Sequence, residues 1–180
     1  MRIGFCGSMS VGKTTLVNAL KEMEQFKDYK FATERSKYLN DLGIPLNTDS
    51  TLLGQFVFMA ERAAELMNEN IISDRTIYDV CAFTFSSKSI VWSEKETLVK
   101  TGMLLNNKYD IIFYVSPEGV EIEDNGVRTI DPDYRMKIDA VIKAMLKEYP
   151  PTVPNELIAR VNSHPIVLHF SVNQSISNMK

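Results

Sequence analysis

The sequence predicts an α/β fold in which helices cover both faces of a parallel β-sheet. Short apolar runs alternate along the chain with longer segments of helical periodicity, and a glycine-rich loop joins the first apolar run to the first helical segment. Strands that alternate with helices are typical of parallel sheets, because each pair of parallel strands needs a crossover connection.

Five strands are expected, each a short and mostly apolar run followed by a polar residue or a glycine. In chain order they cover residues 3–6, 29–32, 70–73, 110–115 and 166–170. The helices between them are expected over residues 13–25, 50–68, 76–86, 93–107 and 133–147, with a short one after Pro154.

Periodicity and breaker residues support the helices. Leu16, Val17 and Leu20 share one side of the first helix, and Pro132 and Pro150 bracket the helix over 133–147. In the helix over 50–68, the apolar residues at helical spacing are expected to face the core; they are Leu53, Phe56, Val57, Ala60 and Ala64, and Phe56 and Phe58 are both expected to pack there. Residues 116–131 contain one proline, two glycines and five acidic residues, which predicts a loop.

Length and composition exclude several classes of protein. The 180 residues suit one domain, so we expect a single domain over 1–180 with a frayed tail at 171–180. Hydrophobic residues make up 44% and charged residues 24% of the chain, which is ordinary for globular proteins and excludes disordered and collagen-like classes. The net charge of −3 lacks the basic surplus of proteins that bind nucleic acid through phosphates.

The same data bear on redox state and location. Cys6 and Cys81 stand alone in apolar stretches and are expected to be buried free thiols. The longest apolar run, residues 111–115, is too short to span a membrane, and the strand pattern begins at once, which leaves no room for a signal peptide. We therefore expect a cytoplasmic protein.

The strongest motif is the segment over residues 7–14, Gly-Ser-Met-Ser-Val-Gly-Lys-Thr, which fits G-x-x-x-x-G-K-[ST] at every fixed position. Glycines let the chain curl so that amide hydrogens point at phosphate oxygens, and the helix that follows adds unpaired amides. Lys13 is expected to reach the β- and γ-phosphates, and the Thr14 hydroxyl to ligate Mg²⁺. The expected nucleotide ligands are Gly7, Ser10, Val11, Gly12, Lys13, Thr14 and Thr15.

Two further sequence features help to distinguish between the classes of phosphate-loop protein. Residues 107–110 have the sequence of the N-K-x-D motif with which GTPases recognise guanine. In GTPases this motif follows a strand, whereas here it lies before one, where it could not reach a base. Asp74 and Arg75 follow the third strand, at the edge where open α/β sheets bind ligands. Asp74 is a candidate to hold Mg²⁺ or accept a proton, with helix capping as its alternative, and Arg75 a candidate to face substrate.

With these residues the chain resembles the nucleoside and nucleotide kinases of the P-loop class. Thymidylate and deoxynucleoside kinases have an acidic–Arg pair after the third strand and an acidic turn after the second, here Glu34 and Arg35. The segments over 109–118 and 123–128 and the pair Asp133 and Arg135 are similar to the ribosylnicotinamide kinase branch. The resemblance implies a three-layer fold with a five-stranded sheet ordered 2-3-1-4-5 and a lid over 116–131.

The resemblance also implies site roles. Glu34 would act as general base or orient the ribose, and Arg128 would close on the transferring phosphoryl group as a lid arginine. Arg135 is either a second lid cation or a solvated charge. On the helix over 50–68, Gln55 and Arg62 are candidates to face the acceptor, and Tyr38, Tyr78 and Trp92 are candidates to stack on a base.

The resulting hypothesis is ATP- and Mg²⁺-dependent phosphoryl transfer to a small acceptor, either ribosylnicotinamide, a deoxynucleoside or a nucleoside monophosphate. Lys13, Asp74, Arg128 and Glu34 would be catalytic, with either carboxylate as the base. Arg35, Gln55 and Arg75 would join Glu34 in binding the acceptor. Two alternatives remain open: a kinase for a polynucleotide end or modified base, and a regulatory ATPase without a small acceptor. A homodimer is compatible with all of them.

Overall fold

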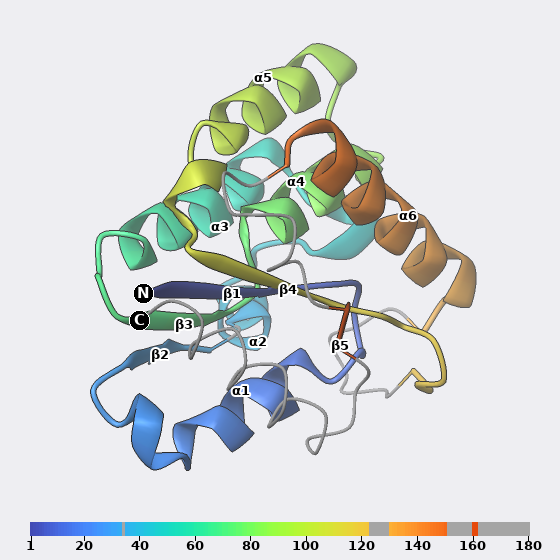
Figure 1. Ribbon diagram of the computed structural model, residues 1–180. Coiled ribbons are helices and arrows are strands. Elements are labelled where there is room, and N and C mark those ends of the chain that lie inside the picture. The colour runs from blue at the N-terminus through green and yellow to red at the C-terminus, as the bar shows by residue number, and fades with distance from the viewer. Residues whose placement is uncertain (34, 123–129, 151–159, 162–180) are drawn as a thin grey trace.

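The computed structural model describes residues 1–33, 35–122, 130–150 and 160–161. Its centre is one parallel sheet of five strands in the order β2-β3-β1-β4-β5 (Figure 1). The strands are β1 (Arg2–Cys6), β2 (Lys30–Ala32), β3 (Ile71–Asp74), β4 (Ile111–Val115) and β5 (Arg160–Val161). The predicted fold class and strand order are confirmed.

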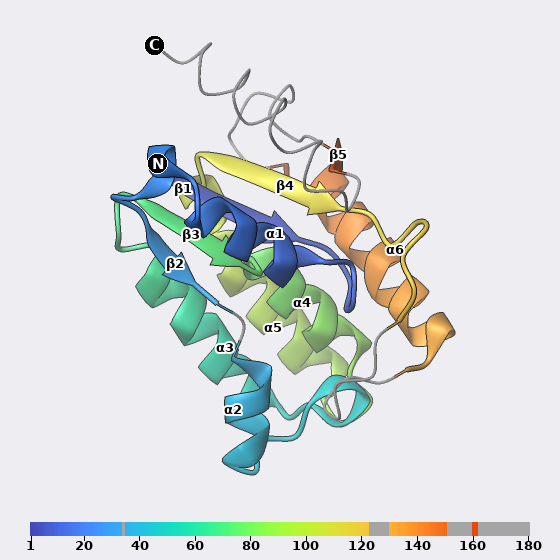
Figure 2. The same cartoon turned by 90° about the horizontal axis from the view of Figure 1, so that it is seen from below.

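Helices cover both faces of the sheet, as predicted. Helix α1 (Lys13–Lys21) lies on one face, and α3 (Leu52–Glu65), α4 (Ile77–Ser86), α5 (Trp92–Met103) and α6 (Pro132–Glu148) lie on the other (Figure 1). The short helix α2 (Ser36–Asp41) extends beyond the end of β2 (Figure 2). Three 3₁₀ turns complete the described elements: η1 (Glu24–Phe26), η2 (Asn47–Asp49) and η3 (Asn106–Lys108).

Each face of the sheet has its own apolar core. On the α1 side, Phe5 and Phe113 stack with ring centroids 5.1 Å apart, and the predicted stripe of Leu16, Val17 and Leu20 packs with them. On the other side, residues of α4 and α6 pack against β1 and β4 around Cys6 and Ile112. Cys6 and Cys81 are both free and buried, as expected.

The topology fixes where a ligand can bind. Strand β1 is central, with β3 on one side and β4 on the other, so the chain switches direction across the sheet at the carboxyl end of β1. Phe5 pairs with both Asp74 and Phe113, so these three strands end at nearly the same level. Open α/β sheets bind ligands at such a switch point.

Helix α1 is shorter than the predicted range of 13–25. It ends at Lys21, and the chain then turns through η1, which buries Phe26. The next positions of its buried stripe fall on Met23 and Glu24, so little apolar surface remains to hold a longer helix against the sheet.

The predicted core face of α3 is wrong. Leu53 is 75% exposed and Phe56 is 45% exposed, whereas the buried positions of this helix are Gly54, Gln55, Met59 and Arg62. Phe58 is partly buried and does pack against the core. On this side of α3, Arg62 pairs with Glu65, which accepts a hydrogen bond from Ser73 on β3, and apolar periodicity alone cannot reveal such partners.

The last predicted elements, the helix after Pro154 and the strand over 166–170, lie outside the described residues, as does the tail over 171–180. The fifth strand of the described sheet is instead Arg160–Val161, which pairs with Tyr114 and Val115. Among the helices described, none combines the length and apolar character needed to cross a membrane.

Candidate nucleotide-binding site

The phosphate loop, residues 7–14, links β1 to α1 at the carboxyl edge of the sheet (Figure 2). A Cβ on Gly7 would lie 2.5 Å from the carbonyl oxygen of Val115, so only glycine fits between the loop and β4. Gly12 and Ser10 adopt left-handed φ values of 86° and 55°. This conformation strains Ser10, since a side chain disfavours it by about 1–2 kcal/mol. Such strain at a loop apex is typical of binding sites.

Lys13 is buried at the start of α1 and faces back into the loop. Its Nζ donates hydrogen bonds to the carbonyls of Gly7 at 2.6 Å and Ser8 at 2.7 Å. Burial lowers the pKa of Lys13 below its usual value, and the carboxylate of Asp79 opposes this shift. The lysine is therefore a desolvated cation with a preference for added negative charge.

Asp79 is a site residue that the sequence analysis missed. Its Oδ1 lies 3.7 Å from Lys13 Nζ and accepts a hydrogen bond from the Gly7 amide at 3.3 Å. Its Oδ2 accepts from the backbone amide of Thr76 at 2.8 Å and from the Thr76 hydroxyl at 2.9 Å. Thr76 and Asp79 thus form the capping box of α4 while the same carboxylate supports the phosphate loop. In the sequence, the three-residue spacing of Thr76 and Asp79 could have predicted the capping box, but not the contact with Lys13.

Thr14 and Asp74, the two residues of the predicted metal site, are in direct contact. The Thr14 hydroxyl donates to Asp74 Oδ2 at 2.5 Å, and Oδ1 of the same carboxylate is buried with no hydrogen-bond partner. Two hard oxygen donors with an unsatisfied carboxylate oxygen fit Mg²⁺, which prefers one or two carboxylates together with water and substrate phosphates. The helix-capping alternative for Asp74 is wrong, because Thr76 caps α4.

Arg75 adopts a left-handed φ of 111°, a rare conformation for a residue with a long side chain. Its guanidinium lies over the ring of Phe83, 5.2 Å from the centroid. The ring of Phe83 also packs edge-on against Tyr134, whose hydroxyl is buried with no partner. Backbone strain at Arg75 and an unsatisfied hydroxyl on Tyr134 are features that often accompany functional sites.

Arg62, one of the acceptor candidates on α3, lies in a polar network. Arg62 donates to Glu65 at 2.5 Å, and Ser73 on β3 donates to the same carboxylate. Arg35 forms an ion pair of 3.0 Å with Glu61 and is half exposed. These contacts connect the N-cap of α2 with α3 and β3.

Gln55 lies seven positions before Arg62, two helical turns away on the same buried side of α3. Both residues are buried, and their role toward an acceptor stays a prediction. Two residues assigned to catalysis from the resemblance, Glu34 and Arg128, lie outside the described residues.

The three aromatic stacking candidates have other surroundings. Tyr78 is fully buried and donates its hydroxyl to the Tyr149 carbonyl, so it belongs to the core. Trp92, the first residue of α5, is exposed and packs edge-on against Phe85 of α4. Tyr38 is half exposed, with the guanidinium of Arg35 4.4 Å above its ring, which leaves Tyr38 as the remaining candidate to contact a base.

Arg135 is not a solvated charge. It is buried, and its guanidinium donates to the carbonyls of Ser10, Pro117 and Val120. Its contact with the phosphate loop spans 125 positions of sequence, a distance over which no local pattern carries information.

Comparison with known proteins gives a family and a set of similar folds. The model of a family described as AAA domain matches residues 2–156. No curated protein sequence matches the chain at a significant level.

Solved structures are similar in fold at low identity. A deoxyadenosine kinase from M. mycoides, solved with the products dCMP and a flexible dCDP, aligns over 100% of both chains with a TM-score of 0.65 and 16% identity. The same enzyme with bound dCTP gives a TM-score of 0.60 at 15% identity over 99% of this chain and 98% of that one. NadR in complex with NR gives a TM-score of 0.72 at 15% identity and covers 96% of this chain. The chain spans 50% of NadR.

Proposed function

The chain belongs to the AAA domain family, and from this premise we propose that it is a kinase that transfers the terminal phosphoryl group of ATP to a small nucleoside or nucleotide. One observation carries the proposal. A complete phosphate loop, with Lys13 buried inside it, stands beside the contact between Thr14 and Asp74 at the switch point of the sheet. The fold is shared with enzymes that act on nucleosides, which supports the choice of acceptor.

ATP binding uses groups that the fold already holds in place. Lys13 occupies the loop by bonding to the carbonyls of Gly7 and Ser8. When ATP binds, Lys13 exchanges these carbonyls for the β- and γ-phosphate oxygens, and the loop amides and the start of α1 donate to the remaining oxygens. Thr15, which is exposed beside Thr14, contacts the next phosphate toward the nucleoside.

Thr14 and Asp74 would hold Mg²⁺, which neutralises charge between the β- and γ-phosphates when bound. The unsatisfied Oδ1 of Asp74 is the atom with spare capacity for a ligand or for water. Among the described residues no group of three or more His, Cys, Asp or Glu side chains lies together. The remaining ligands of the ion would therefore be phosphate oxygens and water, the usual arrangement for Mg²⁺.

In the reaction, the acceptor oxygen attacks the γ-phosphorus of ATP. The new oxygen–phosphorus bond forms as the bond from the γ-phosphorus to the bridging oxygen breaks, and ADP leaves. The proton of an acceptor hydroxyl passes to Asp74 or to Glu34 as general base. Lys13 and Arg128 neutralise charge on the transferring group.

The acceptor lies on the α2–α3 side of the site. Gln55 offers an amide that can pair with the edge of a base, and Arg35 and Arg75 supply positive charge for an acceptor phosphate or hydroxyl. The candidate acceptors are ribosylnicotinamide, a deoxynucleoside or a nucleoside monophosphate.

The lysines argue against a polynucleotide acceptor. Lys27 and Lys100 are neutralised within their own elements by Glu24 and Glu96, and Lys95 donates to carbonyls at the end of α4. A regulatory ATPase remains the second candidate, because the family description alone does not name an acceptor.

The deciding experiment incubates the full chain with ATP, Mg²⁺ and a panel of nucleosides, nucleoside monophosphates and ribosylnicotinamide, with the Lys13→Met variant as the blank. Mass spectrometry detects any phosphorylated acceptor, and a coupled assay detects ADP. A phosphorylated product that depends on Lys13 supports the kinase. Equal ADP formation with and without every acceptor would instead support the ATPase.

A further inference from the structure

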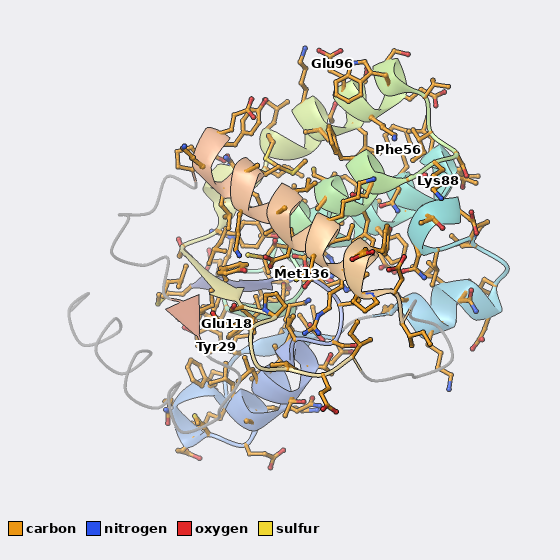
Figure 3. All side chains as sticks on the ribbon, turned by 90° about the vertical axis from the view of Figure 1, so that its right-hand side faces the viewer. Tyr29, Phe56, Lys88, Glu96, Glu118 and Met136 are labelled. Atoms are coloured by element: carbon orange, nitrogen blue, oxygen red, sulfur yellow. The ribbon has the colours of Figure 1, made fainter. Side chains whose placement is uncertain are left out.

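The first turn of α6 brings a buried arginine to the phosphate loop. Arg135 is 5% exposed, whereas the next residue, Met136, labelled on α6 in Figure 3, is 53% exposed. Asp131 caps the helix by accepting from the amides of Asp133 and Tyr134, which fixes the direction in which this turn begins. With the start of α6 fixed in this way, Arg135 lies on the buried side of the helix and Met136 on the exposed side.

The guanidinium of Arg135 joins two loops that are remote in sequence. Nη2 donates to the Ser10 carbonyl and to the Pro117 carbonyl, both at 3.3 Å, and Nη1 donates to the Val120 carbonyl at 2.6 Å. Ser10 is the apex of the phosphate loop, and Pro117 and Val120 lie in the segment after β4. A planar group with several donors at fixed angles suits this task, and a lysine could not span the same carbonyls.

The bond to Ser10 has a consequence for the amide that follows. Across a trans peptide the carbonyl of one residue and the N–H of the next point in opposite directions. Arg135 holds the Ser10 carbonyl toward α6, so the Val11 N–H is directed away from α6. Ser10 also has a left-handed φ of 55°, which is unfavourable without a contact that holds it.

We propose that Arg135 is a positioning residue that sets the peptide between Ser10 and Val11 for phosphate binding and ties the segment over 117–120 to the phosphate loop. It acts through the loop backbone and does not itself contact the phosphates. The proposal rests on the nucleotide binding proposed above and adds a determinant of that binding from outside the phosphate-loop motif.

The test measures ADP affinity by calorimetry on the full chain, so it needs no acceptor and no turnover. Arg135→Met keeps apolar volume and should weaken ADP binding about tenfold, because charge-assisted hydrogen bonds to the loop are lost. Arg135→Lys should lose less. Lys137→Met is the matched control, since it removes a positive charge from an exposed position of the same helix and should bind ADP normally. Millimolar guanidinium chloride should restore ADP affinity to Arg135→Ala, and equal sodium chloride should not.

Thermal midpoints establish that each variant is folded. If Arg135→Met does not fold, the ADP affinity of Arg135→Lys is compared with that of the wild type instead. Folded variants that bind ADP as tightly as the wild type would overturn the proposal. So would a variant with unchanged ADP affinity but a reduced kcat, because the side chain would then act on the transferring group directly. If the wild type itself fails to bind ADP or ATP, it is the proposed function that falls.

Discussion

The Thr14 hydroxyl donates to the Asp74 carboxylate over 2.5 Å and so joins the first turn of α1 to the end of β3. These two side chains come from segments sixty positions apart in the chain, and the parallel pairing of β1 with β3 brings them together. One oxygen of Asp74 is used by Thr14 and the other has no partner. The pair defines the proposed Mg²⁺ site.

Asp74→Asn should lower kcat about a hundredfold and raise the Mg²⁺ concentration needed for half-maximal activity, because a neutral amide binds the ion poorly. Magnesium titrations at saturating ATP measure both effects. Thr14→Val should shift the magnesium requirement in the same direction, and Thr14→Ser, which retains the hydroxyl, should not. An unchanged magnesium requirement in Asp74→Asn would remove this residue from the metal site.

Lys13→Met should abolish turnover, by about a thousandfold or more, without lowering the thermal midpoint. Burial already lowers the pKa of Lys13, which means that the fold holds the charged form at a cost. An apolar side chain of similar length removes that cost, and because it also leaves the buried Asp79 carboxylate without its cation, any gain in stability is offset. Steady-state rates and thermal denaturation on the same preparation check both statements, and retained turnover would refute the assignment of the phosphate loop.

ATP affinity should fall at alkaline pH as Lys13 loses its proton, and in Asp79→Asn this fall should occur at a lower pH than in the wild type. The Asp79 carboxylate raises the pKa of Lys13 against the effect of burial, so its neutralisation lowers that pKa further. Lys13 then loses its proton at a lower pH, and its attraction for phosphate is lost there. Nucleotide titrations between pH 7 and about 10 measure the shift.

The matched control for Asp79→Asn is Asp139→Asn. Asp139 is another buried aspartate, bound to Tyr114 and Lys143, and its charge is not among the main influences on the pKa of Lys13. A shift of the same size in Asp139→Asn would mean that the effect reflects a general loss of stability.

Gln55→Ala should raise the KM for the acceptor about tenfold and leave the KM for ATP unchanged, since Gln55 lies on α3 and away from the phosphate loop. Initial rates with each substrate varied in turn separate the two constants. Gln25→Ala, at an exposed position of η1, serves as the control. Equal increases in both constants would argue against a role in acceptor recognition.

Met59→Ala should lower the free energy of unfolding by about 2–5 kcal/mol, whereas Leu53→Ala should change it by less than about 0.5 kcal/mol. Met59 is 6% exposed and Leu53 is on the outer face of the same helix. Urea denaturation measures both values. The reverse ranking would restore the helix orientation expected from apolar periodicity.

Features set by local sequence were predicted well. The first four strands and the phosphate loop depend on short apolar runs and on glycine spacing, and they appear where the sequence places them. The fifth strand, Arg160–Val161, does not coincide with the predicted run over 166–170. The strand order followed from the family resemblance and is confirmed. Cys6 and Cys81 are buried thiols for the same local reason.

Features set by distant partners were not predictable. The buried face of α3 is chosen by the pairing of Arg62 with Glu65 and of Glu65 with Ser73 on β3, none of which changes the periodicity of the helix. Arg135 could not be placed, because its partner Ser10 lies 125 positions away in the sequence. Asp79 was visible only as a capping signal, and its contact with Lys13 needed the geometry of β1 and α4.

The double use of Asp79 makes the start of α4 a reporter of nucleotide occupancy. The carboxylate that accepts from the Gly7 amide also accepts from the Thr76 amide, so a ligand that draws Lys13 or Gly7 toward phosphate changes how firmly the first turn of α4 is held. Amide hydrogen exchange at residues 76–80 should therefore change rate when nucleotide binds, although none of these amides belongs to the phosphate loop. Protection there would reveal an occupied site without any catalytic assay.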